Sequence, residues 1–111
     1  MDLKKNTVYE YPYHENHPVI VLFFKVLSKW NNENLAKFLL FLTGSSQVPI
    51  NGFKAFKERG NPITISDGGD KTRFPAAHTC FNMLDLPKYN NEKEMNNKLI
   101  RAIQEREFGF A

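Results

Sequence analysis

The segment Pro18-Val19-Ile20-Val21-Leu22-Phe23-Phe24-Lys25-Val26-Leu27 carries the longest apolar run of the chain and decides how it can fold. Its apolar side chains recur at the i, i+3, i+4 and i+7 spacing of one helix face: Ile20, Phe23, Phe24 and Leu27. Pro18 suits the first turn of a helix, because the N–H that proline lacks has no partner there. The run therefore predicts a buried helix from Pro18. It is broken by Lys25 and falls short of the about 20 residues that cross a bilayer, so we expect no membrane span.

Two later segments also show helical spacing. Asn31 offers an N-terminal cap, and Glu33 follows in the first turn, where a negative charge suits the helix dipole. Gly44 stands where a left-handed C-terminal residue is expected. Near the end of the chain, Asn90-Asn91 caps a final helix. The apolar faces of these two helices are Leu35, Phe38, Leu39 and Leu42 in one, and Met95, Leu99, Ala102 and Ile103 in the other.

Short strands are predicted between the helices. Ile63-Thr64-Ile65 alternates and is bounded by Gly60-Asn61-Pro62 and Asp67-Gly68-Gly69-Asp70, both turn signals. Residues 78–82 are expected to be extended, and Leu84 and Leu86 continue the alternation until a proline follows. Residues 1–16 carry no long period and are interpreted as a partly extended connector. The pattern predicts an α+β fold: a small single domain with helices packed on a short mixed sheet.

Composition excludes several classes of function. The 111 residues suffice for one domain with one modest core. Lys and Arg, 15 in number, are interleaved with 12 Asp and Glu, so no basic stripe of the kind that binds nucleic acid forms. There is no Cys/His spacing typical of zinc and no Gly-rich phosphate loop, so we expect no metal and no cofactor. Nothing in the sequence favours an obligate dimer, and we expect a monomer.

The only cysteine, Cys80, lies in the run Pro75-Ala76-Ala77-His78-Thr79-Cys80-Phe81-Asn82. In an extended segment His78, Cys80 and Asn82 would share one face, while Thr79 and Phe81 would point into a core. An imidazole and a carboxamide would then flank a sulfur nucleophile. The alternative is that Cys80 is inert core packing, as most free cysteines are. A single thiol and a charged N-terminus without a secretory signal indicate a reducing compartment, the cytoplasm or also the nucleus.

Several segments resemble those of a known protein family and follow one another in the same order. They are residues 74–89 around Cys80, residues 41–53, residues 6–9 with 17–20, and the tail 107–111. In this order they resemble the C-terminal, catalytic-cysteine lobe of HECT-type E3 ubiquitin-protein ligases, and they cover nearly the whole chain. The resemblance implies a transferase that needs no cofactor. Departures from the family pattern occur at Phe24, Gln47, Phe74, Met83 and Lys88. Those at Gln47 and Met83 replace residues that are commonly Arg in the family, and with them any polar contacts that such Arg residues make.

The resemblance also implies a division of the chain and roles for particular residues. Residues 1–16 would be an interlobe hinge and residues 17–111 the catalytic lobe. Cys80 would accept ubiquitin from a ubiquitin-conjugating enzyme as a thioester and pass it to a lysine of a substrate protein. His78 and Asn82 would support the transfer. Phe108, fourth from the end, would dock on an N-terminal lobe, which in the family precedes this one in cis.

Two other functions are weighed against the transferase. A module with this fold could bind ubiquitin or another partner without turnover. A cysteine hydrolase would need a general base, and no His follows Cys80 to serve as one. For the neighbours of Cys80 we prefer an orienting role for His78. For Asn82, donation to an oxyanion and a structural tie of the loop stay open. Asp85 could activate the attacking amine or be an ordinary exposed carboxylate.

Overall fold

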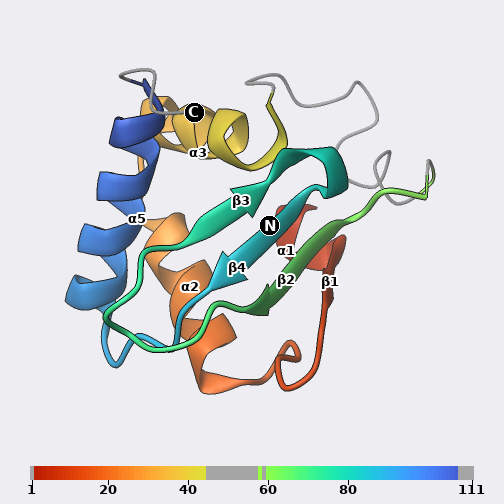
Figure 1. Ribbon diagram of the computed structural model, residues 1–111, viewed down its shortest axis with the longest axis horizontal. Coiled ribbons are helices and arrows are strands. Elements are labelled where there is room, and N and C mark those ends of the chain that lie inside the picture. Colours follow the sequence, from red (N-terminus) through yellow and green to blue (C-terminus); the bar gives the residue numbers. More distant parts are fainter. Residues whose placement is uncertain (1, 45–57, 59, 108–111) are drawn as a thin grey trace.

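A mixed sheet of four strands, in the order β1-β2-β4-β3, forms the centre of the structure (Figure 1). The computed structural model describes residues 2–44, 58 and 60–107. The strands are β1 (Thr7–Tyr9), β2 (Ile63–Asp67), β3 (Ala76–His78) and β4 (Met83–Leu86). β2 pairs in parallel with β1 and with β4, whereas β3 runs antiparallel to β4 at one edge. The α+β prediction with a short mixed sheet is confirmed.

The alternation of side chains gives the sheet two unlike faces. One face is apolar and lies in the core: Ile63, Ile65, Leu84 and Leu86 are all buried there. Their neighbours along β2 and β4 point to the opposite face, since successive residues of a strand alternate. That opposite face is polar and carries Ser66 and Asp85, which lie opposite each other in the register. The predicted alternation of Leu84 and Leu86 is thus confirmed.

The helices pack against the apolar face and beside the sheet. They are α1 (Asp2–Lys5), α2 (Pro18–Ser28), α3 (Asn32–Thr43) and α5 (Glu92–Glu107). The predicted caps are present, because the side chains of Asn31 and Asn91 accept from the backbone N–H of Asn34 and Glu94, each at 2.8 Å. Gly44 ends α3 with φ +82°, as predicted. In the described part of the chain, no helix combines the length and apolarity needed to cross a membrane.

The N-terminal segment belongs to the folded unit. β1 pairs with β2 from Thr7 opposite Ile63 onward, and Leu3 of α1 is buried in the core. Tyr13 is also buried, and its hydroxyl donates to the carbonyl of Leu86 at 2.5 Å. The expected connector is therefore extended in part, at β1. Its one helical turn was not predicted, because four residues are too few to show a period. The hinge role of residues 1–16 stays a prediction.

A tight clamp joins the ends of β2 and β4. The N–H of Gly68 donates to the carbonyl of Leu86 at 2.9 Å, and the N–H of Lys88 donates to the carbonyl of Gly69 at 3.0 Å. Asp67 accepts from the N–H of Gly69 at 2.8 Å and pairs with Lys88 Nζ at 2.7 Å. These contacts extend the parallel pairing past the last strand residues and hold the chain where it leaves the sheet.

Gly68→Ala tests the close approach at this clamp. A Cβ on Gly68 would lie 2.7 Å from the backbone nitrogen of Pro87 and 2.9 Å from the carbonyl carbon of Asp85. Because both neighbours are backbone atoms, the clash can be relieved only by moving the clamp. We expect a loss of about 2 kcal/mol in the free energy of unfolding, measured by urea denaturation. Lys71→Ala, an exposed change in the following turn, is the control and should leave the midpoint unchanged. Equal midpoints for the two variants would show that the approach is not tight.

Asp67→Asn tests the charge in the same clamp. The hydrogen bond from Lys88, and then that from the Gly69 N–H, hold the pKa of Asp67 below its ordinary value of 3.8. A carboxyl whose pKa is lower in the folded state stabilises the fold above about pH 4, and this contribution is lost as the pH falls through the folded value. The variant should therefore be less stable at pH 7 and lose less stability on acidification, as followed by thermal unfolding. Asp70→Asn removes a carboxylate that accepts only from the Thr72 N–H in the described contacts, and should keep the wild-type slope.

Candidate functional site

Cys80 lies in the short turn that joins the antiparallel strands β3 and β4. β3 ends at His78, residues Thr79–Phe81 form a 3-10 helix, η1, and β4 begins at Met83. Asn82 closes the turn in the left-handed region with φ +50° and ψ +40°. The chain must reverse here because His78 pairs with Met83 across the antiparallel ladder. The segment that carries the predicted nucleophile is thus a tight reversal at the edge of the sheet.

The prediction that residues 78–82 are extended is wrong. A 3-10 helix repeats every three residues, so His78, Cys80 and Asn82 do not share one face in the way that an extended strand would impose. The expectation that Phe81 points into the core is also wrong, because its side chain is 66% exposed. Thr79 is half-buried and lies beside Gly44 at the end of α3. A Cβ added to Gly44 would lie 4.0 Å from the Cβ of Thr79. The sequence did not distinguish a turn from a strand here, because a reversal of so few residues shows no periodic pattern of apolar side chains.

Asn82 is buried and fixes the turn to the loop before β2. Only 4% of it is exposed, and its Nδ2 donates to the carbonyl of Asn61 at 3.0 Å. Its own carbonyl accepts from the N–H of Thr64 at 3.0 Å. Asparagine tolerates the left-handed region better than most residues. These contacts match the structural alternative for Asn82, a tie between loop and backbone, and they occupy one of its two amide protons.

His78 and Asp85 meet on the polar face of the sheet. The His78 Nε2 lies 2.7 Å from Asp85 Oδ2, and the two side chains are 49% and 31% exposed. Ser66 of β2 donates its hydroxyl to Asp85 Oδ1 at 2.5 Å. Sequence reasoning considered His78 and Asp85 separately and missed Ser66. Only the register, with Ser66 opposite Asp85 and His78 two residues from the partner of Asp85, brings the three together.

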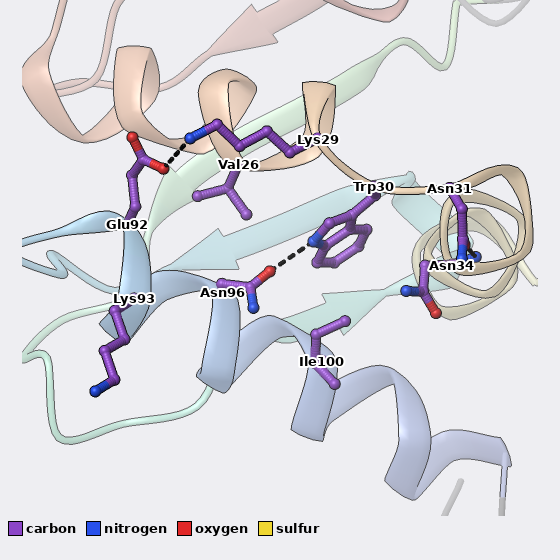
Figure 2. A pocket seen from close by; sticks show the side chains of 9 residues that line it. All are labelled: Val26, Lys29, Trp30, Asn31, Asn34, Glu92, Lys93, Asn96 and Ile100. Carbon is purple, nitrogen blue, oxygen red and sulfur yellow. Dashed lines mark hydrogen bonds and ion pairs between the residues drawn. The ribbon is translucent and has the colours of Figure 1, made fainter.

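A separate groove lies between the α2–α3 corner and α5 (Figure 2). It encloses about 620 Å³. Across it, Trp30 Nε1–H donates to Asn96 Oδ1 at 2.6 Å, and Lys29 Nζ donates to Glu92 at 2.7 Å. Hydrogen bonds from Lys29 and Lys25 hold the pKa of Glu92 below its ordinary value. Of the residues predicted for the site, His78 and Asn82 do not line this groove, and the described residues of its walls bond mainly to one another.

The other predicted positions have these places. Phe108 and Gln47 lie outside the described residues. Phe24 is buried in α2, and Met83 is half-buried at the start of β4. In the part of the chain that the structure describes, no three or more His, Cys, Asp or Glu side chains gather in a way that could hold a metal ion.

Comparison with known proteins places the whole chain in one family. The family model for the HECT-domain (ubiquitin-transferase) matches residues 1–111. The chain is 43% identical over 112 residues to the E3 ubiquitin-protein ligase Nedd-4 of Drosophila melanogaster, and 44% identical over 110 residues to the probable E3 ubiquitin-protein ligase HERC4 of Homo sapiens. Both matches cover 99% of this chain, but 11% and 10% of those relatives. The E3 ubiquitin-protein ligase pub1 of Schizosaccharomyces pombe is 42% identical over 106 residues, which are 94% of this chain and 14% of the relative.

Substitution of Asn82 by Ala or by Gly separates its two contributions to the turn. Ala loses the hydrogen bond to Asn61 and keeps a Cβ in the left-handed region without the tolerance that Asn has there, which should cost about 2 kcal/mol of unfolding free energy. Gly also loses the hydrogen bond but has no Cβ to be strained in the left-handed region, and should cost about 1 kcal/mol. Urea denaturation followed by circular dichroism measures both. Wild-type stability in both variants would show that Asn82 does not hold the turn.

Proposed function

Because the chain belongs to the HECT-domain ubiquitin-transferase family, we propose that it carries the catalytic cysteine of a ubiquitin ligase. In this proposal Cys80 accepts ubiquitin from a conjugating enzyme and transfers it to a substrate lysine. The observation that supports it most is the position of Cys80 in the β3–β4 turn, two residues after the exposed His78. The turn lies at the edge of the sheet, and in the proposal two other proteins meet this turn in succession.

The proposed reaction has two acyl-transfer steps. First, the Cys80 thiolate attacks the thioester carbonyl at the C-terminus of ubiquitin, and the thiolate of the conjugating enzyme leaves. Second, a substrate lysine that has lost its proton attacks the new thioester, and the Cys80 thiolate leaves as the isopeptide bond forms. Covalent catalysis of this kind replaces one difficult transfer by two easier ones. A thioester suits both steps, since it stays activated towards amines.

His78 is proposed to orient the incoming amine. Its Nε2 is engaged by Asp85, so the Nδ1 of the ring is the atom left for a hydrogen bond with the lysine. For Asn82 the burial and the bond to Asn61 favour the structural role. Oxyanion donation by Asn82 would have to use its second amide proton and stays the less supported alternative.

The proposed function also requires partners that are not part of this structure. They are ubiquitin, a ubiquitin-conjugating enzyme, a substrate protein and an N-terminal lobe in cis that recruits the conjugating enzyme. Residues 1–16 would be the hinge between the lobes, and Phe108 would dock on the N-terminal lobe. We expect the reaction in the cytoplasm, and also in the nucleus. The competing proposal is a module that binds ubiquitin without turnover.

A charging assay tests the proposed nucleophile. The chain is incubated with ubiquitin-activating enzyme, a panel of conjugating enzymes, ubiquitin and ATP, with and without a HECT N-terminal lobe added in trans. On non-reducing gels we expect a ubiquitin adduct that reductant removes. Cys80→Ala should abolish the adduct, while Cys80→Ser should give an oxygen ester that reductant leaves intact. Lys71→Ala, exposed and remote from the turn in sequence, is the control and should charge like the wild type.

The assay also separates the two proposals. If no adduct forms even with the added lobe, while the chain still binds ubiquitin in solution, the binding module replaces the transferase. An adduct that persists in Cys80→Ala would place the acceptor elsewhere in the chain.

A further inference from the structure

Three side chains from three strands form a continuous hydrogen-bonded row on the polar face of the sheet. Ser66 Oγ donates to Asp85 Oδ1 at 2.5 Å, and Asp85 Oδ2 lies 2.7 Å from His78 Nε2. The row begins at Ser66, which is 9% exposed, and ends at the exposed His78 immediately before the turn of Cys80. Burial therefore decreases along the row towards the candidate nucleophile.

The row fixes which atoms carry protons. An ionised carboxylate only accepts hydrogen bonds, so His78 must donate to Asp85 through Nε2–H. When the ring is neutral, its Nδ1 is then an acceptor, and this is the atom available to an amine. A partner on one ring nitrogen commonly decides the chemistry of the other. Asp85 thus determines that Nδ1, and not Nε2, is the ring nitrogen of His78 that is available to an amine.

Ser66 in turn restricts Asp85. The backbone of Asp85 is held from both sides, because it pairs with Ser66 in β2 and with Ala76 in β3. What remains free is the rotation of its carboxylate about the side-chain bonds. The hydroxyl of Ser66 holds one oxygen, and the other oxygen then points to His78. Without the hydroxyl, the carboxylate can turn towards water and release the ring.

We propose that Ser66 is a positioning residue for the transfer to lysine, acting on His78 through Asp85. This inference rests on the proposed function of Cys80. Ser66 does not touch the reacting atoms, and it contributes by holding His78 with Nδ1 free to accept a hydrogen bond from the amine. The effect concerns the second step, in which an amine attacks, and not the attack of a small thiol, which needs no hydrogen bond to His78.

The first test observes the hydrogen-bonded row of Ser66, Asp85 and His78 directly, in the chain without ubiquitin on Cys80. We expect proton NMR to show a downfield Nε2–H signal of His78 in the wild type, slow to exchange because it is bonded to Asp85. In Ser66→Ala the exchange should be roughly fivefold faster, as expected for a weakened hydrogen bond. Ser66→Thr keeps a hydroxyl and should restore slow exchange. Thr64→Ala removes a hydroxyl on the same face of β2 that bonds to Pro62 and not to Asp85, and should leave the signal unchanged.

The second test measures transfer. The ubiquitin adduct on Cys80 is formed, the charging enzymes are stopped, and its discharge to free lysine is compared with its discharge to a small thiol. We expect Ser66→Ala to slow the reaction with lysine roughly fivefold and to leave the reaction with thiol unchanged. Ser66→Thr should recover most of the rate with lysine, and Thr64→Ala should match the wild type.

Each outcome decides one point. An unchanged lysine rate in Ser66→Ala would overturn the inference, as would equal slowing with both nucleophiles, which indicates general distortion. An unaltered Nε2–H signal in Ser66→Ala would overturn it at the level of structure. Failure of the wild type to charge with the added lobe would overturn the proposed function and, with it, the role of Ser66 in transfer. The NMR comparison would still decide whether Ser66 holds His78.

Discussion

The parallel pairing of β2 with β4 is the constraint on which the other features depend. Its register places Ser66 opposite Asp85 and Asp67 opposite Leu86. From the same alignment follow the apolar face beneath, the row of polar side chains above, and the clamp at Gly68. A shift of one residue would move every side chain of a strand to the other face. The core and the candidate site are thus two results of one alignment.

The turn between β3 and β4 shows how a general constraint produces a particular geometry. Antiparallel pairing demands a reversal within four residues, and the chain meets that demand with a 3-10 helix and a left-handed Asn82. The buried contact of Asn82 with Asn61 then anchors the reversal to the loop before β2. These neighbours fix the backbone position of Cys80 within the turn. The exposure of the Phe81 side chain follows from the same reversal.

Much of the fold was predictable from sequence because its helices are long and regularly patterned. The stripe that begins at Ile20 and the caps at Asn31 and Asn91 are signals within single segments, and all are confirmed. The candidate site was less predictable. Cys80 and His78 stood out by residue type and by resemblance, but the turn conformation has too few residues to show a pattern. Ser66 could not be connected with Asp85 at all, because strand register is a relation between distant segments.

The unlike faces of the sheet have a consequence for how such a chain can change over generations. Residues on the apolar face are enclosed by helices, so a substitution there alters packing and stability together. His78 and Asp85 are partly exposed on the other face, and Ser66, although only 9% exposed, hydrogen-bonds there to Asp85. Variation at these three positions can therefore alter the polar row while the side chains of the apolar face keep their packing. Within one short sheet, selection for stability and selection on the polar row can act on different positions.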